Sequence, residues 1–485
     1  MATPLTISQP GLVLAQSIVT QGIYPSRDSG GYSTVSADAL GIIITTAFNP
    51  SQVQGLLPTS GQTLSLINSG TNQALYSVIG GYYGEHSNTA FDLPNLSGAA
   101  ILGYSQQGGQ AFGSFQGTEN NNWLLEQSQL PYTLGGQSMP VSNAQYAQTL
   151  QYIIQINGEY PTGSSPSPYT LGTIYAFAGN YIPEGFAACN GQRLPINNYS
   201  ALFTLLGTNY GGDGSTYFQV PNLTNALPIG AGGQYMVGET VGTLSTTLFN
   251  EMVPGSIGAT AGAVPLSTMQ PSLALNYIIY VEGLYNAMTE DSPMLGQVTM
   301  YAGMRPPEGW VLCEGQSLSI ADYPALYNLL GTAFGGDGVS TFALPDLRDR
   351  TIIGSGTSAE LAIGQVLGEA EAYITLANLP EIVVPALGLS LANDSGASAT
   401  DHVTNAFTLD VLGLWPGAQL QYSTDGQTWT TSYQAHQGAN SLWVRQMDVI
   451  GQTSQASQRL DFVLDSAAPV TPTVNIEYGL AAISH

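Results

Sequence analysis

Short apolar segments with alternating polar positions recur along the whole chain, and turns rich in glycine or proline separate them. The stretch GTIYAFAGNYIP at 172–183 alternates in this way, which is typical of a β-strand. Asn190-Gly191 follows in a position suited to the positive φ of a hairpin turn. The pattern therefore predicts a chain of short strands, with a hairpin in this stretch.

A short helix is predicted directly after this hairpin. The apolar residues of 199–206 are spaced for one face of a helix, Asn197 or Asn198 precedes the first turn, and Gly207 supplies the stop. Asp322 and Pro324 open the equivalent helix later in the chain.

The strongest pattern is a match of the chain with itself. Residues 171–223 align with 295–347 without a gap, and about half of the aligned residues are identical. A third, diverged copy at 60–96 keeps the G-Q-x-L, A-L and F-x-L-P-N-L elements but has no GGDG. The sequence predicts three compact modules that contain more strand than helix.

The order of these motifs allows a family to be named. G-Q-x-L, then A-L-(F/Y)-x-L-L-G-T-x-(Y/F)-G-G-D-G, then F-x-(L/V)-P-(N/D)-L resembles the phage tail-collar domain, which is also found in the microcystin-dependent protein family. The resemblance implies a virion fibre or collar component, or a secreted bacterial relative. It brings no catalytic residues with it.

The first two copies end in a long apolar strand, at 150–161 and 270–286, whereas the third copy runs from 375–380 directly into a different domain. Residues 9–25 align with 270–286 without a gap. The positions that carry this match are Pro10, Leu12, Leu14, Ile18, Gly22 and Tyr24. We expect this N-terminal segment to be the closing strand of the third repeat, because a module without it would expose a sheet edge.

Three arrangements of this strand are open. If it completes repeat 3 of its own chain, the three repeats close into a pseudo-threefold ring. If it enters a neighbouring subunit, the contact is heterologous and propagates into a filament. It could also simply pair at the edge of repeat 1. The filament is our leading hypothesis at this stage.

From about 383 the pattern changes to alternating strands with frequent turns, which favours a β-sandwich. The segment resembles bacterial immunoglobulin-like domains of surface adhesins in its Y-S-x-D-G-x-x-W hairpin and its terminal L-D-S-x-A-P. Aspartates near the expected strand ends are candidate calcium ligands. They are Asp394, Asp401, Asp448 and Asp465. Aspartate as an ordinary turn former is the alternative.

The predicted fold class is mainly β with short helices, as α+β collar-like modules plus an all-β immunoglobulin-like sandwich. The predicted divisions are an N-terminal closing strand (1–28), repeat 1 (29–165), repeat 2 (166–290), repeat 3 (291–382), the immunoglobulin-like domain (383–470) and a C-terminal tail strand (471–485).

The amino-acid composition limits the classes of binding partner that we expect. Only 8% of residues are charged, the formal net charge is −25, and the seven basic residues are all arginine. Such a field repels phosphate backbones and anionic lipid, so we expect neither nucleic acid nor a membrane surface as partner, while divalent cations such as calcium suit it. The N-terminus has no basic region typical of a signal peptide, and no segment has the apolar length of a membrane span.

Side chains suited to catalysis are scattered. Cys189 and Cys313 occupy the same place in two repeats and are expected to be buried structural thiols, not a disulfide. The four histidines, His86, His402, His436 and His485, are scattered over three of the predicted divisions, so we expect no enzyme.

Two functions remain open at this stage. The first is a structural subunit of an extracellular filament or surface matrix, a homopolymer at the cell surface. The second is a phage tail or collar fibre, part of a virion, which binds a host receptor such as a cell-surface glycan.

Overall fold

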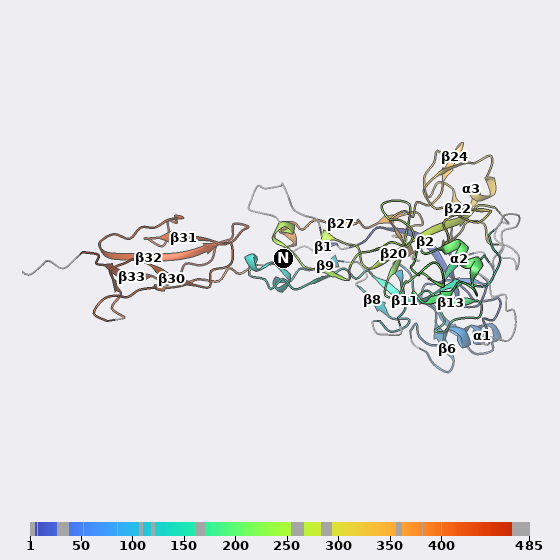
Figure 1. Ribbon diagram of the computed structural model, residues 1–485, viewed down its shortest axis with the longest axis horizontal. Coiled ribbons are helices and arrows are strands. Elements are labelled where there is room, and N and C mark those ends of the chain that lie inside the picture. Colours follow the sequence, from blue (N-terminus) through green and yellow to red (C-terminus); the bar gives the residue numbers. More distant parts are fainter. Residues whose placement is uncertain are drawn as a thin grey trace, which may run out of the picture.

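The computed structural model describes residues 5–6, 8–26, 38–51, 53–84, 86–105, 110–117, 122–161, 170–253, 266–282, 293–355, 361–380, 382–398 and 400–467. The molecule is elongated and has three parts (Figure 1). The sandwich is residues 385–467, and the neck comprises the described parts of 5–6, 122–142, 245–267 and 371–384. The remaining described residues form the head. The first described residues, Leu5 and Thr6, lie in the neck.

Each repeat in the head contributes the same set of elements. The long strands are β2 (Gly11–Val19), β11 (Ala147–Gln155) and β20 (Ser272–Tyr280), and the central strands are β3 (Ile42–Thr46), β12 (Thr173–Phe177) and β21 (Gln297–Tyr301). Short strands next to them are β4 (Leu56–Pro58), β13 (Phe186–Ala188), β22 (Trp310–Leu312), β7 (Ala100–Gly103), β16 (Leu227–Gly230), β25 (Thr351–Gly354), β8 (Phe115–Gln116), β17 (Thr240–Val241) and β26 (Val366–Leu367). Each repeat also has a helix and a small hairpin: α1 (Gly70–Ile79) with β5 (Thr63–Ser65) and β6 (Ala90–Asp92), α2 (Ser200–Leu206) with β14 (Arg193–Pro195) and β15 (Tyr217–Gln219), and α3 (Pro324–Leu330) with β23 (Ser317–Ser319) and β24 (Thr341–Ala343).

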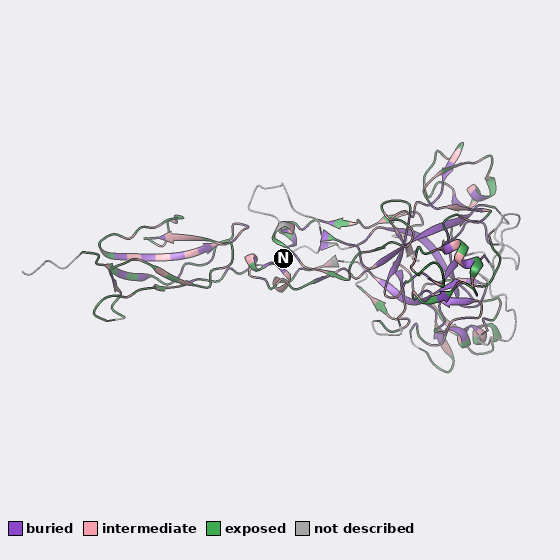
Figure 2. Ribbon diagram, in the orientation of Figure 1, coloured by how far each residue is buried: buried purple, intermediate pink, exposed green. Residues whose placement is uncertain are grey.

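The three central strands pair with one another in a closed triangle. β12 pairs with β21, β21 with β3, and β3 with β12, all antiparallel. Each of them also pairs with one long strand, so a single 15-stranded sheet runs through all three repeats. The long strands are buried along their entire length (Figure 2), because other parts of the head cover both of their faces.

Every long strand is shared between two repeats. The first half of β11 pairs in parallel with β7 of repeat 1, and its second half pairs with β12 and β13 of repeat 2. The strand β20 divides in the same way between repeats 2 and 3. No repeat is therefore a complete sheet by itself.

Three equivalent glycines hold the repeats in close contact. Each ends a short parallel strand and lies against the backbone of a leucine in the next repeat, where an added Cβ would come within 2.0 Å or less of the carbonyl oxygen. The pairs are Gly103 with Leu223, Gly230 with Leu347, and Gly354 with Leu96. Only glycine allows this approach between two backbones.

The neck continues the threefold arrangement. Three short antiparallel ribbons form it: β1 (Leu5–Thr6) with β9 (Asn122–Trp123), β10 (Val141–Ser142) with β18 (Ser245–Thr246), and β19 (Leu266–Ser267) with β27 (Glu371–Ala372). Short 3-10 turns follow the ribbons: η1 (Gln127–Gln129), η2 (Tyr132–Leu134), η3 (Asn250–Met252) and η4 (Leu376–Asn378). Leu5, Val141 and Leu266, one from each ribbon, are buried in a common core.

The sandwich has two sheets packed on a core of its own. The strands β28 (Gly388–Leu391) and β30 (Leu409–Leu412) form one sheet. The second sheet has the order β29 (Val403–Thr404), β33 (Leu460–Leu464), β32 (Gly438–Met447), β31 (Gln419–Ser423). From Asn440 on, the residues of β32 alternate between buried and intermediate, which is typical of a strand covered on one face only.

The predicted fold class, mainly β with short helices, is confirmed, but the hairpin at Asn190-Gly191 is wrong. Gly191 has a positive φ of 72°, yet the strands on either side pair elsewhere, β13 with β11 and β14 with β15. The turn carries the chain from the large sheet into the small hairpin. The helix begins one residue later than predicted, with Tyr199 at the N-cap and no side-chain cap.

One turn motif recurs in the head and in the sandwich. Asp213, Asp337 and Asp425 are each followed by a glycine with positive φ, and each carboxylate accepts backbone N–H groups from the next few residues. Hydroxyl donors, such as those of Thr216 and Ser340, add a further hydrogen bond. The GGDG element thus shapes a turn.

Stability at acid pH should depend on these turns. Hydrogen bonds from hydroxyl and backbone donors hold the pKa values of Asp213, Asp337 and Asp425 well below their usual range. A depressed folded-state pKa means that the stabilisation is present above an unfolded value of about 4 and is lost as the pH falls through the folded-state value. We expect a triple variant, Asp213→Asn with Asp337→Asn and Asp425→Asn, to be less stable than the unmodified protein at pH 7. It should also lose stability less steeply between about pH 4 and pH 2. Thermal melts across this range would measure both slopes, and equal slopes would contradict the assignment.

The glycine contacts make a second prediction. Gly230→Ala should destabilise the protein by at least about 2 kcal/mol, because a Cβ at 1.9 Å from the Leu347 oxygen forces two backbones apart. Gly70→Ala is the matched control, since a Cβ there meets nothing within 4 Å. Melting temperature is the measurement, and similar values for the two variants would show that the contact is not tight.

Candidate functional site

The N-terminal strand is the feature on which the sequence-based hypotheses differ. In the structure the first half of β2 pairs in parallel with β25 of repeat 3 in the same chain, with Leu12 opposite Ile352 and Leu14 opposite Gly354. The N–H of Thr351 donates to the oxygen of Pro10 at 3.0 Å. Equivalent bonds of the same length join Ala100 to Tyr146 and Leu227 to Pro271.

The second half of β2 belongs to repeat 1. Ile18 lies opposite Ile43 and Leu57, and it is fully buried. Gly22 lies so close to the Asp38 oxygen that a Cβ would come within 1.8 Å of it. Tyr24 is 53% exposed, and its hydroxyl hydrogen-bonds to Ser77 of α1 at 3.0 Å. The strand therefore completes repeat 3 and also pairs at the edge of repeat 1.

The structure does not support the expected addition of this strand to a neighbouring subunit, because it pairs the strand within its own chain. Three of the residues predicted to enter a neighbour, Leu12, Leu14 and Ile18, are buried inside the chain's own ring, and Leu12 and Leu14 lie in the core of repeat 3. Pairing within the chain satisfies the same backbone groups without a second molecule. In this arrangement the N-terminal strand closes its own ring, and a head-to-tail link would require it to leave this position.

A ring of three glutamines marks the end of the long strands nearest the neck. The backbone N–H of Gln9 donates to the side-chain oxygen of Gln145, that of Gln145 to Gln270, and that of Gln270 to Gln9, at 2.9, 2.9 and 3.2 Å. All three are buried. Sequence reasoning aligned Gln9 with Gln270 but gave neither a role. The ring links each long strand directly to the other two and so fixes their relative positions.

The two thiols lie where the repeat pattern placed them, in equivalent positions of repeats 2 and 3. Cys189 and Cys313 are both free and buried, and burial raises the pKa of each thiol above its ordinary value. They contribute to different parts of the hydrophobic core. A buried, protonated thiol is a poor nucleophile and a poor metal ligand.

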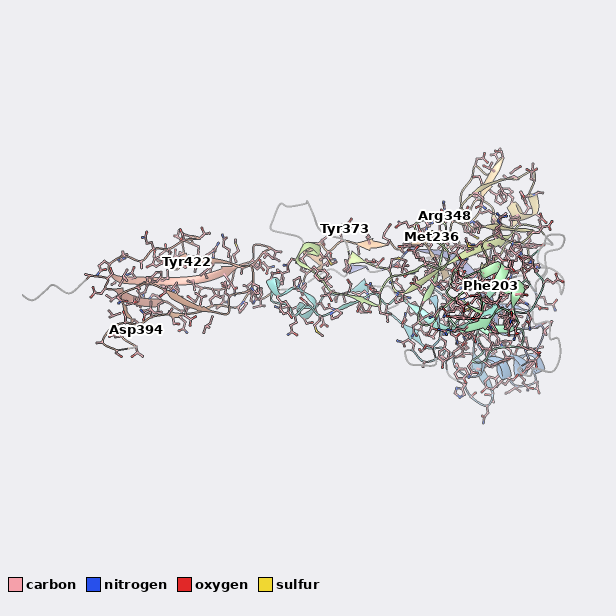
Figure 3. The ribbon with its side chains drawn as sticks, viewed as in Figure 1. Phe203, Met236, Arg348, Tyr373, Asp394 and Tyr422 are labelled. Atoms are coloured by element: carbon pink, nitrogen blue, oxygen red, sulfur yellow. The ribbon has the colours of Figure 1, made fainter. Side chains whose placement is uncertain are left out.

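The four candidate calcium ligands are not brought together. Asp394 and Asp401 share the loop between β28 and β29 (Asp394 is labelled in Figure 3). There Asp394 accepts the N–H of His402, and Asp401 accepts those of Ser398 and Val403. These bonds, that from Ser398 foremost, lower the pKa of Asp401.

The other two aspartates have local partners of their own. Asp465 lies after β33 and accepts a hydrogen bond from Gln437, and Asp448 lies in the turn after β32. Within the described residues no group of three or more His, Cys, Asp or Glu side chains could hold a metal ion. Calcium binding at these four aspartates stays a prediction.

Asp448 has a structural position that the sequence did not indicate. Its Oδ1 accepts the N–H groups of Ile450 and Gln452 at 3.0 and 2.8 Å, and this shapes a turn that inserts Ile450 into the core of the neck. Burial raises the pKa of Asp448. Trp415 contacts the same core, and a Cβ on Gly135 would come within 2.1 Å of its ring. The sandwich is therefore packed onto the neck.

Comparison with known proteins identifies the repeats. Three segments, 41–101, 172–228 and 296–352, match the family model described as Phage Tail Collar Domain. The chain thus contains three phage tail collar domains. Each match ends within β7, β16 or β25, so the long shared strands lie outside the matched segments. No curated protein and no solved structure matched the chain.

The N-terminal strand should be required for a stable ring. A chain lacking residues 1–25 should melt at a markedly lower temperature, because repeat 3 loses its closing strand and repeat 1 loses a strand that pairs at its edge. A synthetic peptide of residues 5–25 should bind the truncated chain and restore most of the melting temperature. The same peptide with Leu14→Asp should not, because it would bury an unpaired charge in the core of repeat 3. An unchanged melting temperature on truncation would contradict the assigned role.

Proposed function

We propose that this chain is a structural component of a phage tail or tail fibre, located in the virion. The observation that carries the proposal is the presence of three phage tail collar domains in one chain. The closed ring supports the proposal, because a head that closes within one chain can enter a larger assembly as a single folded unit. The neck and the sandwich extend from it as an arm (Figure 1).

The extracellular filament that the sequence favoured has lost its main argument. That hypothesis depended on a closing strand free to enter a neighbour, and this strand is paired inside its own chain. The resemblance of the sandwich to immunoglobulin-like adhesin domains remains a prediction, and within a tail it fits an arm that reaches a receptor. Among the described residues, no helix has both the length and the apolar character needed to cross a membrane.

Virion composition tests the proposal. Mass spectrometry of purified phage particles should detect the chain in fixed stoichiometry with the tail proteins. Antibodies raised against residues 385–467 should label tails in negative-stain images. Finding the chain only in cell-surface material that contains no phage particles would overturn the proposal.

Electron microscopy of the purified protein gives an independent readout. We expect discrete elongated particles with one broad end, and the same particles after addition of calcium, because ring closure within the chain leaves no N-terminal strand to link subunits. Long filaments that disappear on deletion of residues 1–25 would restore the polymer hypothesis.

A further inference from the structure

A depression of about 520 Å³ lies where repeat 1 meets repeat 2. Repeat 1 contributes Tyr104 and Gln151, and repeat 2 contributes Tyr181, Asn190, Asn222 and Thr224 among others. This volume falls within the range of small-ligand sites, which is roughly 300–1,000 Å³. None of the described residues that line the depression carries a charge.

The tyrosines at its border are held in place by other aromatic rings. Tyr104 packs edge-on against Phe112 at 5.2 Å between ring centroids, and Tyr82 also packs edge-on against Phe112, at 5.3 Å. Tyr181 packs edge-on against Phe177 at 5.3 Å, and its hydroxyl donates to the oxygen of Pro25. Rings fixed in this way offer flat apolar surface at little cost in conformational entropy.

The amides supply polar groups beside these rings. Asn190 and Asn222 are exposed, and each uses its side-chain oxygen to accept the backbone N–H two residues further on, at 3.1 Å in both cases. Their Nδ2 groups have no hydrogen-bond partner among the described residues. Gln151, which is 9% exposed, also lines the depression, and its Nε2 donates to the oxygen of Tyr152. Amides of this kind can both donate to and accept from hydroxyl groups.

The equivalent contact between repeats 2 and 3 is built differently. Asp346 and Arg348 stand at the positions of Asn222 and Thr224, and they form a bidentate salt bridge with N···O distances of 2.9 and 2.8 Å. Arg348 is labelled in Figure 3. Ala231 stands at the position of Tyr104, next in the chain to the equivalent glycine. The repeat 1–2 contact thus has neutral amides and an aromatic ring where the other has an ion pair and a methyl group.

From this geometry we infer that the depression between repeats 1 and 2 binds a neutral saccharide. The apolar face of a sugar ring stacks on a tyrosine, and its hydroxyls pair with the amides of Asn190, Asn222 and Gln151. An acidic sugar or a phosphate finds no cation among the described residues of the lining and is repelled by the field of a chain with net charge −25. The inference deepens the proposed function, since a tail component with such a site would contact a host glycan.

The repeats themselves provide the variants that test it. Asn222→Asp combined with Thr224→Arg introduces the ion pair of repeat 3, and Tyr104→Ala introduces its alanine, so both changes use residues that the fold already accepts at equivalent positions. Tyr373→Ala is the matched control, because Tyr373 is 57% exposed in the neck (Figure 3) and lies away from the depression. Melting temperatures of all variants check that each is folded.

The probes are glucose, galactose, mannose and N-acetylglucosamine, their β-linked disaccharides, and sialic acid as the acidic comparison, each followed by saturation-transfer NMR on the full chain. We expect saturable binding of at least one neutral sugar, weakened about tenfold or more by the double variant and by Tyr104→Ala, and unchanged in Tyr373→Ala. Absence of neutral-sugar binding, binding of sialic acid alone, or binding that survives both variants would overturn the inference. Because the assay uses purified protein, such a failure leaves the virion test of the proposed function unaffected.

Discussion

The division of each long strand between two repeats is the constraint on which the rest of the head depends. The first half of each strand hydrogen-bonds to the repeat behind it and the second half to the repeat ahead, so no repeat has a complete sheet of its own. A linear series of such repeats would leave one open edge at each end. The N-terminal strand β2 occupies both at once, through β25 on one side and β3 on the other. Closure within one chain removes these edges without the concentration dependence of a three-chain assembly.

Closure also determines where the three repeats can differ. Two sets of contacts between the repeats tolerate almost no change of side chain. They are the glutamine ring and the three glycines that lie against a carbonyl oxygen in the next repeat. Residues between the repeats that take no part in these two sets of contacts are free of that restriction. This explains how Asn222 and Thr224 in repeat 2 can correspond to Asp346 and Arg348 in repeat 3 while the backbone hydrogen bonds around them persist. A ring made of one chain can therefore carry a different surface on each side, which three identical chains cannot do.

Much of this could be predicted from the sequence, because duplicated segments can be compared within one chain. The three repeats, the helix near 199–206 and the kinship of residues 9–25 with 270–286 all followed from that comparison. It could not decide whether β2 pairs in its own chain or in another, because the same residues satisfy the same partners in both cases. The strands around Asn190-Gly191 were assigned to a hairpin because a tight turn looks the same in sequence whether its flanking strands pair together or separately. The close-contact glycines gave no distinct signal either, since glycine usually indicates a turn. Aligning Gly103, Gly230 and Gly354 would have found them.

The junction between neck and sandwich shows how a threefold body holds one arm. Three equivalent ribbons form the neck. Among the described residues, the additional turn η2 occurs in repeat 1 alone. Gly135 at the end of this turn leaves room for the ring of Trp415. Thr133 in the same turn hydrogen-bonds to Asn250 of repeat 2, which fixes the turn across the neck. On the sandwich side, Asp448 shapes the loop that places Ile450 in the neck core. Side chains at the end of the neck, and not the ring itself, therefore break the threefold arrangement at this junction. Because Ile450 is buried in the neck core and the partly buried ring of Trp415 packs against it, one shared core joins the sandwich to all three ribbons of the neck.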